Sequence, residues 1–166
     1  IIPHHLESLT SKLAELGVDM KIDIDSITIH GGLDNLHPID IKTLPYPGFA
    51  TDIQQPLTAL LTQAQGQSIV TETIYTERFK HCFELEKMGA KINVMTPSSF
   101  INGPTPLSGA EVSATDLRCG ACLVIAGLIA DGVTTIRNIY HIERGYEHIV
   151  EKLTAIGAQI WREEIN

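Results

Sequence analysis

The chain has 166 residues, enough for about one domain with a hydrophobic core. Hydrophobic residues make up 43% of it and charged residues 19%, a balance that excludes a disordered chain and an integral membrane protein. Twelve Lys and Arg residues against twenty Asp and Glu residues give a net charge of −8, which argues against sequence-independent binding to nucleic acid or to an anionic membrane surface.

The first predicted helix spans residues 6–16, because its leucines recur at spacings that place them on one helical face. Gly17 would end this helix in a left-handed conformation, and the alternating residues 19–24 predict a strand. Two later segments repeat this order: helix 82–88, Gly89 and strand 91–95, and then helix 149–156, Gly157 and strand 159–161.

Two further helices are expected, each preceded by a Thr-Asp pair. Thr51-Asp52 precedes one of them, and Thr115-Asp116 precedes a helix over residues 117–130. The second helix is apolar nearly all round, which predicts full burial. The remaining segments are assigned by composition as strands 67–75 and 133–140 and as irregular loops 44–48 and 97–106.

The shared pieces define an internal repeat of about 65 residues. Its matching positions are Thr51-Asp52 with Thr115-Asp116, Gly66 with Gly132, Ile74-Tyr75 with Ile139-Tyr140, and Glu77-Arg78 with Glu143-Arg144. We expect a single domain fragment in which residues 1–45 are the tail of a preceding repeat, and residues 46–110 and 111–166 are two repeats. Helices of such units pack inside surrounding sheets or on one sheet face, which predicts an α/β (α+β) fold with internal pseudo-symmetry.

Five charged residues stand at related positions of the repeat, and each has two interpretations. Asp52 and Asp116 are suited to cap helix N-termini, or to act as a general acid or base. Arg78, Arg118 and Arg144 lie beside acidic residues. They fit either surface ion pairs of little stabilising value or a guanidinium cluster that binds phosphate or carboxylate. Spacing alone favours the structural interpretation of each residue.

Cys119 and Cys122 form a C-x-x-C pair inside the predicted buried helix, and Cys82 is the third cysteine. A zinc or redox site needs a second ligand pair or thioredoxin-like surroundings, so we expect small core residues here. No metal-site, dinucleotide or P-loop motif is visible, and no cofactor is expected. The low, odd cysteine count favours a reducing, cytoplasmic compartment. The sequence opens Ile1-Ile2 with no initiator Met or secretory signal, so we expect a piece of a longer protein.

Four strings occur in order along the chain and together carry a family resemblance. They are PGFATDIQQP (residues 47–56), ETIYTERF (72–79), ATDLR (114–118) and IYHIERGYE (139–147). They resemble the carboxy-terminal portion of the UDP-N-acetylglucosamine 1-carboxyvinyltransferases, a family of enolpyruvyl transferases. The resemblance implies transfer of the enolpyruvyl group of phosphoenolpyruvate to the 3-hydroxyl of UDP-N-acetylglucosamine with release of phosphate, the first committed step of peptidoglycan synthesis. It also implies pseudo-symmetric repeats of an inside-out α/β barrel, with helices buried and sheets outside.

The resemblance also implies roles for six residues. Asp52 matches the acid at the sugar 3-hydroxyl and is the candidate general base; Ile74 and Arg78 match the UDP-N-acetylglucosamine side, and Arg118, Arg144 and Asp116 the phosphoenolpyruvate and phosphate side. The implied partners are these two small-molecule substrates and the amino-terminal domain of the same enzyme, with no nucleic acid, membrane or metal. That domain would supply the cysteine-bearing mobile loop and the proton donor, so we expect the isolated chain to be inactive.

Three alternatives remain open. The sister enzyme that acts on shikimate 3-phosphate shares the fold and the chemistry, although the string at residues 139–147 favours the nucleotide-sugar enzyme. A module that binds a UDP-sugar without turnover is the second alternative. A thiol oxidoreductase that uses Cys119 and Cys122 is the third, and it requires a reactive thiolate.

Overall fold

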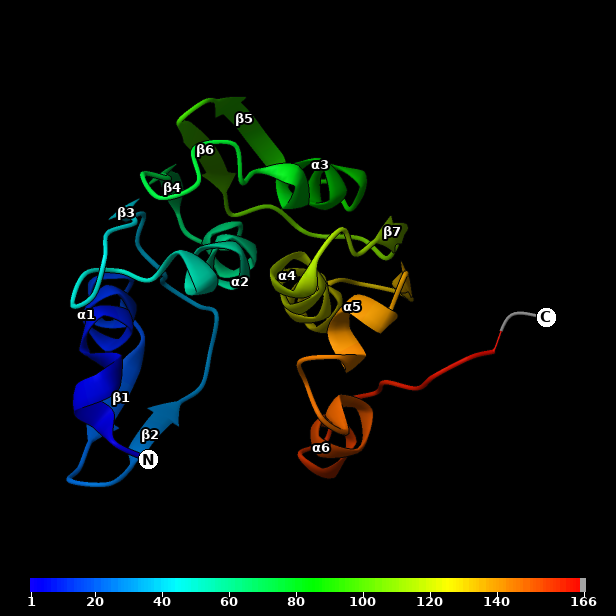
Figure 1. Ribbon diagram of the computed structural model, residues 1–166, viewed down its shortest axis with the longest axis horizontal. Helices are drawn as coiled ribbons and strands as arrows, with labels where there is room; N and C mark the ends of the chain where they lie inside the picture. The colour runs from blue at the N-terminus through cyan, green and yellow to red at the C-terminus, as the bar shows by residue number, and fades with distance from the viewer. Residues whose placement is uncertain (165–166) are drawn as a thin grey trace.

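The computed structural model describes residues 1–164, and its two long helices lie at the centre (Figure 1). Helices α2 (Thr51–Leu61) and α4 (Leu117–Ile129) pack against each other, and α3 (Lys80–Lys87) packs on α4. The shorter helices are the 3-10 helix η1 (Pro3–Leu6), α1 (Glu7–Glu15), α5 (Tyr140–Glu143) and α6 (Ile149–Ala155). Helices α1 and α6 lie apart from each other (Figure 1). Among residues 1–164, no helix is long and apolar enough to cross a membrane.

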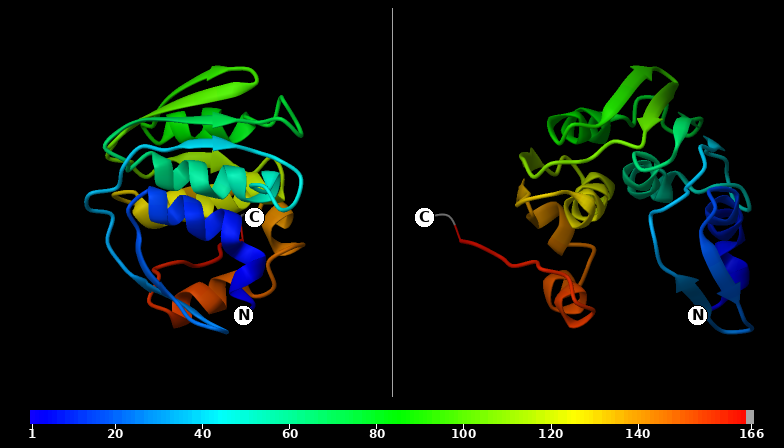
Figure 2. Two further views of the ribbon diagram at one scale, coloured as in Figure 1. Left: turned by 90° about the vertical axis from the view of Figure 1, so that its left-hand side faces the viewer. Right: turned by 180° about the vertical axis from the view of Figure 1, so that it is seen from behind.

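The strands lie on the outer side of this helical centre (Figures 1 and 2). The largest sheet has the order β3 (Asp40–Lys42), β4 (Gly66–Thr71), β6 (Ser98–Gly103), β5 (Lys91–Met95). Its first pair is parallel and its other two pairs are antiparallel. An antiparallel hairpin is formed by β1 (Asp19–Ile22) and β2 (Ile27–His30), and a parallel pair by β7 (Glu111–Ser113) and β8 (Thr135–Arg137).

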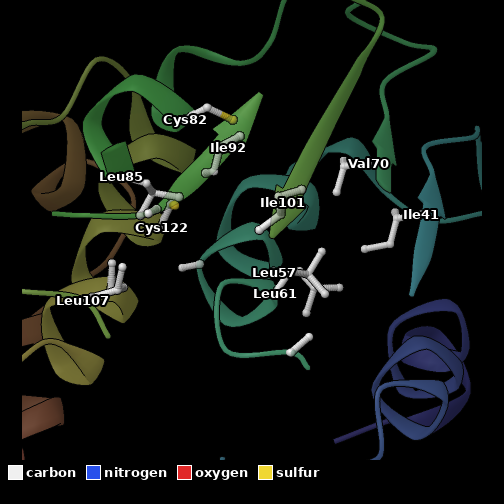
Figure 3. Packing of buried hydrophobic residues seen from close by; sticks show 14 of the residues in the cluster. Ile41, Leu57, Leu61, Val70, Cys82, Leu85, Ile92, Ile101, Leu107 and Cys122 are labelled. Carbon is white, nitrogen blue, oxygen red and sulfur yellow. The ribbon is translucent and has the colours of Figure 1, made fainter. Parts of the chain in front are cut away.

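The hydrophobic core lies between the central helices and the inner face of the four-stranded sheet (Figure 3). Leu57 and Leu61 of α2 point toward Ile101 of β6, and all three are at most 4% exposed. Cys122 of α4 and Leu85 of α3 extend the same cluster. Because burying one large aliphatic side chain contributes about 1.5–3 kcal/mol, this core stabilises the packing of α2 against α4.

The helices form where apolar periodicity predicts them, and their glycine endings are confirmed. Gly17, Gly89 and Gly157 have φ angles of 95°, 98° and 101°, a region that residues with a Cβ atom rarely adopt. Helix α4 is buried over most of its length, as predicted. Its last turn is the exception, because Leu128 is 49% exposed.

Several strand predictions are wrong. Residues 97–106, predicted as a loop, contain β6, which pairs with both β4 and β5. Its pattern is period two, with Ser99 and Ile101 fully buried, and a buried serine disguises that alternation in the sequence. Two predicted strands are shorter in the structure: β4 ends at Thr71 where the predicted strand runs to residue 75, and β8 covers only Thr135–Arg137 of the predicted strand 133–140. Residues 159–161 form no strand. The structure also contains four elements that were not predicted: β2, β3, β7 and α5.

Candidate active site

The packing of α2 on α4 brings Asp52 and Arg118 together across 66 residues of sequence. Asp52 lies in the first turn of α2, and its Oδ1 accepts a hydrogen bond from Nε of Arg118 at 2.5 Å. Nη1 of Arg78 lies 3.7 Å from the same oxygen. The Asp52 side chain is 62% exposed, and ion pairs this open contribute at most about 1 kcal/mol to stability. The three groups, which we call the Asp52 cluster, therefore add little to folding and present charge to solvent.

Asp52 does not cap its helix, so that prediction is wrong. The N-cap of α2 is Ala50, and no side chain hydrogen bonds to the exposed amides there. Asp52 lies two residues after Ala50, and its side chain is directed to Arg118 rather than back to the backbone. The N-cap position of α2 therefore has no capping oxygen, and the Asp52 side chain makes a contact between helices instead.

Asp116 does cap its helix, as predicted. Its Oδ1 accepts hydrogen bonds from the backbone amides of Arg118 at 2.8 Å and Cys119 at 3.1 Å. These bonds satisfy two amides that have no partner within the helix. Asp116 also forms part of a cavity wall, so capping and a place in the site are compatible in one residue.

Arg78 connects the Asp52 cluster to the loop that follows β4. Its Nη1 donates a hydrogen bond to Oγ1 of Thr51 at 2.9 Å. Its guanidinium also lies over the ring of Tyr75, 3.9 Å from the ring centroid, a cation–π contact. Two contacts from different elements therefore fix the direction of the Arg78 side chain.

Glu72 lies beneath that loop with no exposed surface. Its Oε1 accepts hydrogen bonds from the hydroxyl of Thr43 at 2.7 Å and from the amides of Ile74 and Tyr75 at 2.9 Å and 3.0 Å. Its Oε2 accepts one from the hydroxyl of Thr51 at 2.7 Å. Burial would raise the pKa of Glu72, but these four hydrogen bonds together lower it below its ordinary value. Glu72 is therefore a buried, ionised carboxylate.

A cavity of about 640 Å³ opens beside these residues. Three residues predicted for the site, Ile74, Arg78 and Asp116, line it together with Tyr75 and Lys80. This wall combines apolar surface, an aromatic ring, two cationic groups and the carboxylates of Glu77 and Asp116. The cationic groups can bind negative charge on a ligand, and the apolar and aromatic surface can contact a planar or apolar part of it. Within residues 1–164, no group of three or more His, Cys, Asp or Glu side chains is placed to hold a metal ion.

Arg144 lies near the start of α4 but outside the Asp52 cluster. It is the C-cap of α5 and is exposed. Helix α5 is held against α4 at two glycines: a Cβ atom on Gly120 would meet Ile142, and one on Gly145 would meet Leu117. Within the described residues, Arg144 forms no ion pair with Asp52 or Asp116. The structure thus brings together five of the six predicted site residues and leaves Arg144 at the side.

Comparison with known proteins identifies the family to which this arrangement belongs. The family model of EPSP synthase (3-phosphoshikimate 1-carboxyvinyltransferase) matches residues 1–153. The chain belongs to the EPSP synthase family.

One curated protein and two solved structures show how similar this EPSP synthase family chain is to known enzymes. UDP-N-acetylglucosamine 1-carboxyvinyltransferase 2 of Bacillus subtilis (strain 168) is 57% identical over 165 residues, which cover 99% of this chain and 38% of that protein. The solved enolpyruvyl transferase NikO from Streptomyces tendae has a TM-score of 0.86 at 33% identity, covering 93% of this chain and 36% of NikO. EPSP synthase from Acinetobacter baumannii, at 21% identity with a TM-score of 0.69, covers 95% of this chain and 37% of its own and shares the fold. The chain spans less than two fifths of each of these relatives.

The three cysteines of this EPSP synthase family chain are buried and free, as expected of core residues. Burial raises the pKa of Cys82 to about 12 and also raises the pKa values of Cys119 and Cys122. Since the thiolate is the reactive form, these thiols are inert at neutral pH. This removes the basis for a thiol oxidoreductase.

Thr51, Glu72, Tyr75 and Lys80 belong to the site but are not among the predicted site residues. In the sequence, Thr51 and Tyr75 stand out only as members of the repeat and of the family strings, and Glu72 only as the first letter of one string. A glutamate that directly follows a strand and precedes Thr-Ile-Tyr gives no periodic signal. Its role becomes visible only when Thr43 and Thr51 are brought to it by the fold.

Proposed function

We propose that this chain is part of a cytoplasmic enzyme that transfers the enolpyruvyl group of phosphoenolpyruvate to the 3-hydroxyl of UDP-N-acetylglucosamine and releases phosphate, in peptidoglycan synthesis. The observation that carries this proposal is the Asp52 cluster beside the cavity lined by Ile74 and Arg78. It is supported by the name of the 57% identical relative, UDP-N-acetylglucosamine 1-carboxyvinyltransferase 2. Buried free thiols agree with a reducing compartment.

The proposed reaction is an addition followed by an elimination. In the addition, the sugar hydroxyl oxygen bonds to C2 of phosphoenolpyruvate as its proton passes to a base, and a proton donor adds a proton to C3. In the elimination, a base removes one proton from C3, the C2–O bond to phosphate breaks, and the double bond between C2 and C3 is restored. The addition needs a base for the hydroxyl proton, and Asp52 is our candidate. Its Oδ1 accepts the hydrogen bond from Arg118 and the side chain is exposed, so Oδ2 is the oxygen that we assign to the hydroxyl.

Cationic groups are needed on the phosphate side, because charge develops there as the phosphate leaves. Arg118 is suited to this role, since its hydrogen bond to Asp52 raises the pKa of its guanidinium and keeps it charged. We assign Arg144 to the same side with Asp116, and we assign Ile74 and Arg78 to the UDP-sugar. Arg144 would have to approach the Asp52 cluster when phosphoenolpyruvate binds.

We also propose the larger architecture around this chain. Residues 1–45, 46–110 and 111–166 would be the tail of one repeat and two further repeats of an inside-out α/β barrel. The helices α2 and α4 at the centre and the strands outside support this arrangement. The proton donor would come from the amino-terminal domain of the same enzyme, because the matched part of the Bacillus subtilis relative is only 38% of that protein.

The proposal is tested by titrating the 166-residue chain with UDP-N-acetylglucosamine while amide chemical shifts are recorded. We expect saturable shifts at the Asp52 and Ile74 amides that are lost in an Asp52→Ala chain. An Asp131→Ala chain is the control, because Asp131 is exposed and lies at the far end of α4. Absence of saturable shifts in the unsubstituted chain would contradict the placement of the UDP-sugar site on these residues.

The second candidate substrate is shikimate 3-phosphate, which is favoured by the description of the family model. The same titration with shikimate 3-phosphate separates the two enzymes. Saturation by the UDP-sugar alone supports our proposal, and saturation by shikimate 3-phosphate alone replaces it with the sister activity.

The isolated chain is expected to be catalytically inactive, because the proton donor would come from the amino-terminal domain. Phosphate release should remain at the level of a blank when both substrates are supplied. Steady phosphate release that depends on both substrates would overturn this expectation and place the whole reaction on these residues.

A further inference from the structure

The buried carboxylate of Glu72 connects two parts of the site that come from different elements. One oxygen holds the amides of Ile74 and Tyr75, which begin the loop after β4. The other oxygen holds the hydroxyl of Thr51, which begins α2 one residue before Asp52. All four hydrogen bonds to Glu72 are between 2.7 Å and 3.0 Å.

The direction of each hydrogen bond in this network is fixed by chemistry. Thr51 has one hydroxyl proton and donates it to Glu72, so its oxygen accepts the bond from Arg78. Thr43 likewise donates to Glu72 and accepts from the amide of Thr73. An ionised carboxylate, which only accepts, satisfies every donor around it.

A neutral amide at this position cannot reproduce the pattern. In Glu72→Gln, the amide oxygen can serve the two backbone amides of Ile74 and Tyr75, but the amide nitrogen is then a donor facing the hydroxyl of Thr51. The hydroxyl proton of Thr51 then has no acceptor at residue 72. If the hydroxyl turns this proton toward Arg78, two donors face each other and the hydrogen bond from Arg78 is lost. The link between the loop and α2 is therefore weakened, although the side chain keeps its shape.

We propose that Glu72 is a positioning residue for the UDP-sugar side of this site, holding the loop of Ile74, Tyr75 and Arg78 against the first turn of α2. This inference rests on the function proposed above. Glu72 touches no ligand itself, because it is fully buried. It acts through Thr51 and the loop amides, so that Ile74 and Arg78 face the cavity next to Asp52.

Three variants of the 166-residue chain test the proposal: Glu72→Gln, Thr51→Val and Glu84→Gln. Thr51→Val removes only the connection from Glu72 to α2 and Arg78. Glu84→Gln is the matched control, because Glu84 also accepts a backbone amide bond, from Ser113 at 2.8 Å, but does not line the cavity. For each variant, affinity for UDP-N-acetylglucosamine is measured by titration at a temperature where it is fully folded, together with amide hydrogen exchange without ligand.

Glu72→Gln is expected to weaken the affinity at least about tenfold, as expected for loss of a hydrogen bond to a charged group, and to speed exchange at Ile74 and Tyr75. Thr51→Val is expected to weaken the affinity too, with exchange at Ile74 and Tyr75 unchanged. Glu84→Gln should leave the affinity unchanged. This pattern is not expected of a residue that only stabilises the fold, since all the measured chains are folded.

Three results overturn the proposal in different ways. If Glu72→Gln speeds exchange at Ile74 and Tyr75 while the affinity stays the same, the loop is held by Glu72 but its position does not matter for binding, and the proposed function survives. If the unsubstituted chain does not bind UDP-N-acetylglucosamine, the proposed function fails and this inference fails with it. Should Glu72→Gln not fold, an unchanged affinity in Thr51→Val overturns the proposal.

Discussion

Two aspartates at the N-terminal ends of neighbouring helices, Asp52 in the first turn of α2 and Asp116 at the N-cap of α4, allow a direct test of what capping contributes to this fold. Asp116 accepts two amide hydrogen bonds at the start of α4, whereas Asp52 accepts none at the start of α2. Replacing a capping Asp with Ala costs about 1 kcal/mol, within a range of roughly 0.5–2 kcal/mol. Asp116→Asn keeps the capping oxygen and loses only the charge near the helix N-terminus, at a cost of about 0.3–1 kcal/mol.

Asp116→Ala is therefore expected to lower the free energy of unfolding by about 1–2 kcal/mol, and Asp116→Asn by about 0.5 kcal/mol. Asp52→Ala, which removes only exposed ion pairs, should cost less than about 1 kcal/mol. Urea unfolding followed by far-ultraviolet circular dichroism measures all three. Each 1 kcal/mol corresponds to a change of about 2–4 °C in Tm for a chain of this length. Equal losses in Asp116→Asn and Asp116→Ala would refute the argument, because the amide oxygen would then have failed to cap.

Three further results are expected. Because the hydrogen bonds of Glu72 lower its pKa on folding, the stability that Glu72 contributes is complete above the ordinary carboxylate pKa of 4.5 and is lost as the pH falls through the pKa of the folded state. Urea unfolding at several pH values should show this loss. A Glu72→Gln chain that loses stability equally steeply with falling pH would contradict the argument. Leu61→Ala, at a fully buried position, should cost about 2–5 kcal/mol, while Leu128→Ala at a half-exposed position of α4 should change stability by about 0.5 kcal/mol or less; similar losses in both would mean that α2 is not part of the core. The folded chain should resist a thiol reagent at neutral pH and react at all three cysteines in urea, and rapid labelling of folded Cys119 would restore a role for that thiol.

The helices could be predicted from the sequence because their signals are local. Apolar residues at helical spacing and the stops at Gly17, Gly89 and Gly157 depend on a few consecutive residues, and they predict α1, α2, α3, α4 and α6 but not the four-residue helix α5. Strands β3 and β7 are three residues long and pair with strands far along the chain, so they depend on partners that local sequence does not reveal. The same reasoning explains β6, whose buried Ser99 hides the alternation.

The same distinction between local signals and contacts between elements applies to the site. Asp116 was predicted as a cap because an Asp before an apolar helix is a local pattern. The Asp52 cap was wrong, because the side chain is directed to Arg118 on another helix, a contact that exists only after α2 and α4 pack. The six site residues came from family strings, and Glu72 was missed because its four donors come from three separate segments. Contacts between elements set the chemistry here, and only the fold displays them.

The arrangement also explains how an acidic chain can hold an anionic ligand. The net charge is −8, yet α2 and α4 both begin at the Asp52 cluster, and each helix N-terminus behaves as about half a positive charge. Arg78 and Arg118 add two full positive charges at the same place, and these offset the carboxylates of Asp52, Asp116 and Glu72 beside them. Because charges beyond about 8–10 Å are screened at physiological ionic strength, acidic residues elsewhere on the surface do little to change this local balance. The start of α2 and α4 is therefore close to neutral although the chain is acidic, and the net charge of the whole chain does not argue against the proposed phosphate and UDP-sugar sites.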